Sequence, residues 1–151
     1  MASKTLLFVA FFAVSALASV EPKCDCGAVF TNLRAVSDDI LGFFFPLAFA
    51  ESEVEGCAVR ETHELAENLL YKAIVKVSEL SGTPVPHITE RPFALNCAGL
   101  KPSVEKFDVL VKELEAAHAE SVRCKCRNTA LESLLVRLSG LYHNVQKSIG
   151  N

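Results

Sequence analysis

The sequence of 151 residues contains no tryptophan, and its single methionine is Met1. It has no Asn-x-Ser/Thr site, which excludes N-linked glycosylation. Beyond the N-terminal segment it has no apolar run of the ~20 residues that a spanning helix needs, so no integral membrane segment is expected there. Basic residues form no stripe, which argues against nucleic acid or an anionic membrane surface as an electrostatic partner.

The N-terminal segment is typical of a secretion signal. Lys4 precedes an apolar run over residues 6–13, and Ala16-Leu17-Ala18 fits the small-x-small cleavage rule. We therefore expect residues 1–18 to be a cleaved signal peptide and residues 19–151 to form one secreted, extracellular domain. Loss of Lys4 leaves 14 basic and 18 acidic residues, a net charge of −4.

Four segments carry the three-and-four spacing of amphipathic helices, and none of them has a strand pattern. Two of them cover about 28–50 and 58–80, and two more begin near Pro102 and near the capping-box pattern Thr129-x-x-Glu132. The sequence predicts an all-α, disulfide-stapled four-helix bundle. In the first helix the expected core positions are Val29, Leu33, Val36, Ile40, Phe44 and Leu47.

Two further features of the helices affect the expected shape of the bundle. Gly42 and Pro46 should kink or split the first helix, since proline lacks the backbone N–H that continues the hydrogen-bond ladder. Ser81-Gly82 supplies a stop for the second helix. Residues 82–101 contain three prolines and no helical period, so they should form a long connection between the second and third helices.

The six cysteines restrict how these helices are connected. A plain up-down-up-down bundle would leave three thiols at each end, and the ends lie ~30 Å apart, whereas the Cα atoms of bridged cysteines lie within ~7 Å. If residues 82–101 cross back along the bundle, the order becomes up, down, down, up and every thiol finds a partner. This arrangement predicts Cys57–Cys97 and two bridges from Cys24 and Cys26 to Cys124 and Cys126. The pairing between those two Cys-x-Cys motifs stays open.

The sequence offers no complete catalytic or metal-binding constellation. His63-Glu64 lacks the second histidine of a zinc motif, and Glu115-x-x-His118 is half of a di-iron motif, so we expect a solvated histidine at 63 and a core or boundary histidine at 118. Carboxylates are expected on polar helix faces. Because bridged cysteines leave no free thiol nucleophile and no other catalytic motif is complete, we expect no enzyme. Because cysteines of secreted proteins usually form disulfides, we expect no metal, and we expect no cofactor.

The densest aromatic segment is Phe43-Phe44-Phe45-Pro46-Leu47-Ala48-Phe49. Consecutive aromatics point around a helix, so the segment is either core, the wall of an apolar cavity or an exposed contact patch. Our hypothesis is that Phe43, Phe44, Phe45 and Phe49 contribute to a ligand site. The alternative is a site along Leu65, Leu69 and Leu110.

Three functions remain compatible with a secreted helical bundle. The first is binding of an apolar small molecule or lipid between the helices. The second is a cytokine-like signalling or effector protein that acts through a cell-surface receptor, although such bundles usually have two long crossovers. The third is a membrane-active, saposin-like defence protein, which the cysteine spacing and the negative charge disfavour.

Overall fold

The computed structural model describes residues 23–127 and 129–150, so the predicted signal peptide lies outside the described residues. The described part is all-helical and contains no strands. Its elements are α1 (Cys26–Ala48), α2 (Val59–Ser81), the 3₁₀ turn η1 (Ala98–Leu100), α3 (Lys101–Arg123) and α4 (Ala130–Ile149).

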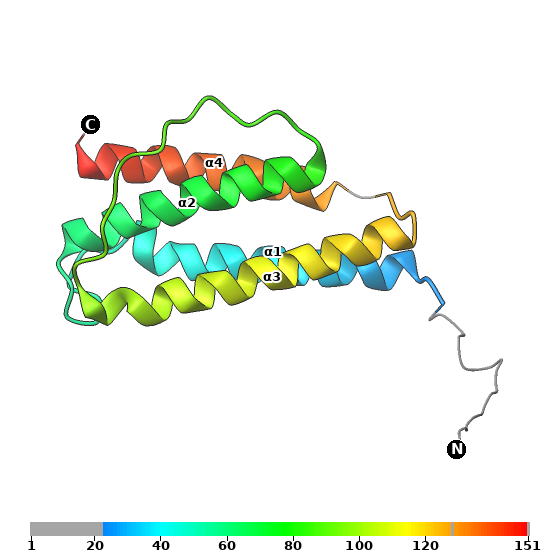
Figure 1. The fold of residues 1–151 in the computed structure, drawn as a ribbon, viewed down its shortest axis with the longest axis horizontal. Coiled ribbons are helices and arrows are strands. Elements are labelled where there is room, and N and C mark those ends of the chain that lie inside the picture. The colour runs from blue at the N-terminus through cyan, green and yellow to red at the C-terminus, as the bar shows by residue number, and fades with distance from the viewer. Residues whose placement is uncertain (1–22, 128, 151) are drawn as a thin grey trace, which may run out of the picture.

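The four helices form a bundle with one long crossover (Figure 1). α1 and α4 run in one direction, and α2 and α3 run in the other. α2 packs most extensively against α4, and α1 packs against α3, so each of these pairs is antiparallel. Residues 83–97 return along the bundle between α2 and η1 without helical structure. The predicted up, down, down, up topology is therefore confirmed.

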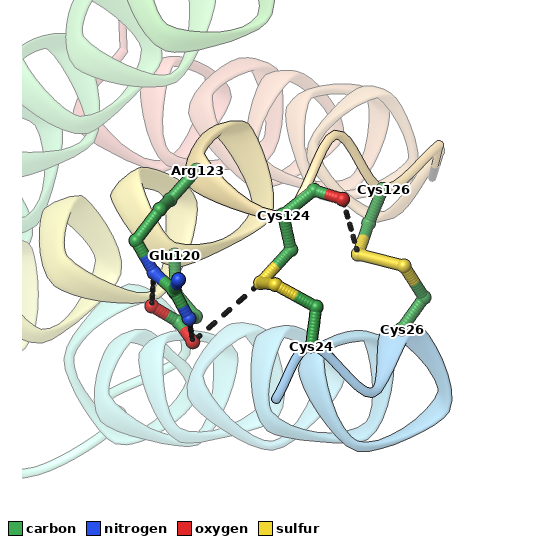
Figure 2. Close-up of polar contacts among 6 residues, drawn as sticks. All are labelled: Cys24, Cys26, Glu120, Arg123, Cys124 and Cys126. Carbon is green, nitrogen blue, oxygen red and sulfur yellow. Dashed lines mark hydrogen bonds and ion pairs between the residues drawn. A yellow bond between two sulfur atoms is a disulfide. The ribbon is translucent and has the colours of Figure 1, made fainter. Parts of the chain in front are cut away.

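Three disulfides join segments that are distant in the sequence. At one end of the bundle, Cys24 pairs with Cys124 and Cys26 with Cys126, with Cα–Cα distances of 5.5 Å in both bridges (Figure 2). At the other end, Cys57 pairs with Cys97 across a Cα–Cα distance of 5.8 Å. The parallel pairing of the two Cys-x-Cys motifs, which the sequence left open, joins the start of α1 to the turn between α3 and α4.

At the end of the bundle that contains Cys57, the packing around Gly99 leaves no room for a side chain. A Cβ atom added to Gly99 would overlap the carbonyl oxygen of Glu55 and would lie 3.2 Å from Cys57 Sγ. A glycine at this point lets the 3₁₀ turn η1 lie directly against the loop before α2. The close approach and the Cys57–Cys97 bridge together fix where the crossover ends.

Helix α1 is one uninterrupted helix, not the split helix that was one of the two predicted outcomes. Pro46 lies inside its last turn, and the helix ends two residues later at Ala48. Proline removes only a hydrogen bond close to the C-terminus at this position, so the helix before it is maintained. All six expected core positions of α1 are buried: Val29, Leu33, Val36, Ile40, Phe44 and Leu47.

The two predicted helix-end signals have different outcomes. Gly82 caps α2 in the left-handed conformation, with φ of 72°, as Ser81-Gly82 predicted. Thr129 precedes α4, but its side chain makes no capping hydrogen bond, so the predicted capping box is wrong. The backbone angles of Thr129, φ −116° and ψ 15°, differ from the extended conformation that a capping residue usually adopts.

The core can be tested with two positions on α4 that differ in burial. Leu138 is fully buried, whereas Val136 is 72% exposed. We expect Leu138→Ala to lower the free energy of unfolding by about 2–5 kcal/mol, because it leaves a cavity in the bundle. Val136→Ala should change it by no more than about 0.5 kcal/mol. Chemical denaturation with the disulfides intact measures both, and equal costs would contradict this assignment of the buried face.

Candidate functional site

The crossover is attached to the helices by polar contacts as well as by a disulfide. Arg91 Nε lies 3.1 Å from Glu67 Oε1 on α2. The hydroxyl of Tyr142 on α4 donates a hydrogen bond to the carbonyl oxygen of Thr89 at 2.9 Å. Together with Cys97, these contacts hold the second half of the crossover against both α2 and α4.

Glu67 corrects the expectation that the carboxylates lie on polar faces. Its residue surface is only 4% exposed, and among the described residues Oε2 has no hydrogen-bond partner. A buried carboxylate is costly without a cation, and Arg91 supplies that cation from the crossover. The sequence did indicate that Glu67 is buried, because His63 and Glu67 continue at helical spacing the apolar stripe formed by Leu70 and Ile74.

Tyr142 lies beside this ion pair and is almost fully buried. Burial raises the pKa of its phenol above the usual value, and the negative charge of Glu67 raises that pKa further. A phenol is already protonated at neutral pH, and the raised pKa extends to higher pH the range in which the hydroxyl donates its hydrogen bond to Thr89. This donor holds the middle of the crossover on α4.

The crossover, α2 and the start of α3 line an open cleft with a volume of about 490 Å³. Leu65 and Leu69 lie one turn apart on α2 and contribute to its lining. Phe93 and Leu95 of the crossover and Val104 of α3 add apolar surface. The volume is within the ~300–1,000 Å³ range of small-molecule sites. Its polar lining groups are Asn68, Lys72, Glu90 and Arg91.

The aromatic segment of α1 does not form one common site. Phe43 and Phe44 are core residues, with ring centroids 6.1 and 5.9 Å from that of Phe107 on α3. Phe45 and Phe49 are 44% and 53% exposed, and their ring centroids lie 6.1 Å apart. None of the four lines the 490 Å³ cleft, whereas Leu65 and Leu69 of the alternative site do.

The two histidines that were considered as metal ligands, His63 and His118, are both at least partly buried in the fold. His63 is buried, not solvated as expected, and its Nε2 lies 2.9 Å from the carbonyl oxygen of Ala50. The loop after α1 covers this face of α2, which explains the difference. His118 is half-buried. Within residues 23–127 and 129–150, no group of three His, Cys, Asp or Glu side chains is arranged to hold a metal ion.

The end of the bundle with two disulfides carries a surface ion pair (Figure 2). Arg123 holds both carboxylate oxygens of Glu120, with Nε–Oε1 and Nη2–Oε2 distances of 3.0 and 2.7 Å. The hydrogen bonds from Arg123 lower the pKa of Glu120 below its usual value. Because this pair is on the surface, we attribute no functional role to it.

The attachment of the crossover can be tested by removing the positive charge of the ion pair between Arg91 and Glu67. Arg91→Ala leaves the Glu67 carboxylate buried beside Tyr142, and we expect it to lower the free energy of unfolding by about 1–3 kcal/mol. The cost should be below that of a fully buried pair because the Arg91 side chain is 37% exposed. Adding Glu67→Gln should recover part of the loss, as measured by urea denaturation.

The control for this experiment is Glu64→Ala, which removes the ion pair between Arg60 and Glu64 but leaves the hydrogen bond from Arg60 to the carbonyl oxygen of Ile149. We expect a cost of at most about 1 kcal/mol. If Arg91→Ala costs no more than Glu64→Ala, the ion pair does not hold the crossover in place.

Comparisons with protein-family models, with curated proteins and with solved structures give no match. Within the part of the chain that the structure describes, none of the helices is both long and apolar enough to cross a membrane.

Proposed function

We propose that this protein is a secreted, non-enzymatic binding protein that holds an apolar small molecule or lipid in the 490 Å³ cleft. The observation that carries the proposal is a cleft of ligand size whose lining includes Leu65, Leu69 and Phe93. Three disulfides support an oxidising, extracellular location, because such bridges persist there and are rare in the cytosol.

The composition of the cleft favours a ligand with both apolar and polar parts. The apolar part would lie mainly against Phe93 and Leu95 of the crossover, because Leu65 and Leu69 are only 1% and 2% exposed at the floor of the cleft. Lys72 and Asn68 lie on the same face of α2 as the leucines and offer hydrogen-bond donors. Apolar burial contributes ~25 cal/mol per Å², and association costs at least ~4 kcal/mol, so we expect micromolar affinity.

The proposal can be tested by titrating a fluorescent fatty acid into the purified, disulfide-intact protein. The test variant is the double substitution Phe93→Ala and Leu95→Ala, which removes apolar lining from the crossover but leaves α2 unchanged. We expect its dissociation constant to rise roughly tenfold, equivalent to about 1.4 kcal/mol of lost contact.

The matched control is Phe45→Ala with Phe49→Ala, which removes two exposed aromatic rings outside this cleft. It should bind the probe as the wild type does. Loss of binding in the control alone would place the site at the aromatic segment of α1. A wild-type protein that binds no apolar probe but docks to a cell-surface receptor would instead favour the signalling function.

A further inference from the structure

A second cleft, with a volume of about 250 Å³, lies between the first halves of α1 and α4. These helices run parallel and begin at the end of the bundle that carries two disulfides. The residues relevant to its chemistry are Phe30, Arg34 and Ser37 from α1, Ser133 and Arg137 from α4, and Thr129 just before α4. This cleft is separate from the proposed apolar site.

The two arginines in this cleft lie at similar depths in the bundle. Arg34 is eight residues after the first residue of α1, and Arg137 is seven residues after the first residue of α4. At 1.5 Å per residue, both are about 11 Å from the start of their helices. Both arginines line the cleft between these parallel helices, so a ligand in the cleft can contact both side chains.

Neither arginine makes an ion pair with a carboxylate among the described residues. The guanidinium carbon of Arg34 lies 5.7 Å from the centroid of the Phe30 ring, an arrangement that orients the side chain without neutralising its charge. Asp38 also lines the cleft and carries one negative charge. The arginines and Asp38 together still leave one net positive charge.

The cleft also contains hydroxyl groups, one of which is buried without a partner. Ser37 is only 8% exposed, and among the described residues its Oγ has no hydrogen-bond partner. A buried hydroxyl without a partner is unfavourable, and a bound ligand can satisfy it. Ser133 and Thr129 add two more hydroxyls beside the N-terminus of α4, where the helix dipole favours negative charge.

We propose that the cleft between α1 and α4 binds the phosphate group of a small molecule or lipid through Arg34 and Arg137. Guanidinium groups donate pairs of hydrogen bonds that match the oxygen atoms of a phosphate, and hydroxyl groups satisfy the oxygen atoms that remain. The volume accommodates a phosphate and the first atoms attached to it, and the partly exposed ring of Phe30 offers apolar contact to those atoms.

The test compares three probes: inorganic phosphate, glycerol 3-phosphate, and phosphatidylcholine vesicles with and without phosphatidic acid. Calorimetry measures the soluble probes and co-sedimentation measures the vesicles. The test variant is Arg34→Gln with Arg137→Gln. We expect the wild type to bind at least one phosphate-bearing probe saturably, and the variant to bind it roughly tenfold to a hundredfold more weakly.

The control variant is Lys101→Gln with Lys106→Gln, which removes the same charge from two exposed positions on α3. It should bind the probe as the wild type does. An equal loss in the control would show that only net charge matters, and it would overturn the proposal. The same holds if no probe binds saturably. Binding of phosphatidic acid vesicles alone, lost only in the arginine variant, supports the proposal and identifies a lipid headgroup as the source.

The singly substituted Arg137→Gln and Ser133→Ala keep the test valid if the double variant unfolds, since both residues are exposed. Each should weaken phosphate binding while the melting temperature stays at the wild-type value. Normal binding by both folded variants would also overturn the proposal. The fatty-acid titration of the 490 Å³ cleft should be unchanged in all these variants. A negative result for phosphate binding therefore leaves the proposed apolar site untouched, and the reverse also holds.

Discussion

The disulfides at each end of the bundle are the constraint on which the rest of the structure depends. Helices of 23 residues are about 35 Å long, whereas bridged cysteines have Cα atoms within 5.8 Å of each other. Cys57 lies two residues before α2 and Cys97 ends the crossover, so their bond requires the chain to return along the bundle. The direction of α3 and the position of the apolar cleft both follow from that return.

The three bridges do not contribute equally in the loop-closure model. Cys24–Cys124 closes a long loop, with a sequence separation of 100, which corresponds to about 4–5 kcal/mol. Once this loop is closed, Cys26–Cys126 adds only a small ring, because each of its cysteines lies two residues from the first bridge. Cys57–Cys97 closes a loop with a separation of 40 that is nested within the first loop, and it holds the crossover in place. We therefore assign to the second Cys-x-Cys bridge the role of fixing the orientation of α1 relative to the turn before α4.

The topology could be predicted from the sequence because it follows from two simple quantities, helix length and disulfide length. The pairing within the Cys-x-Cys motifs could not, since both pairings satisfy those lengths. The apolar cleft depends on how the crossover lies on α2, and that segment has no periodicity from which to infer it. The run of phenylalanines indicated side chains on several sides of α1, but not that Phe43 and Phe44 would pack on Phe107. The helical stripe of α2 indicated that Glu67 is buried, but its ion pair could not be predicted because its partner, Arg91, lies in the same unpatterned crossover.

Peptide mapping without reduction tests the central constraint most directly. Proteolysis of the disulfide-intact protein, followed by mass spectrometry, identifies which cysteine peptides are joined. The crossover arrangement predicts a Cys57–Cys97 pair and two bonds between the peptides that carry the Cys-x-Cys motifs, with Cys24 joined to Cys124 and Cys26 to Cys126. A bond from Cys24 or Cys26 to Cys97 would contradict the arrangement, because it would place the end of the crossover at the opposite end of the bundle.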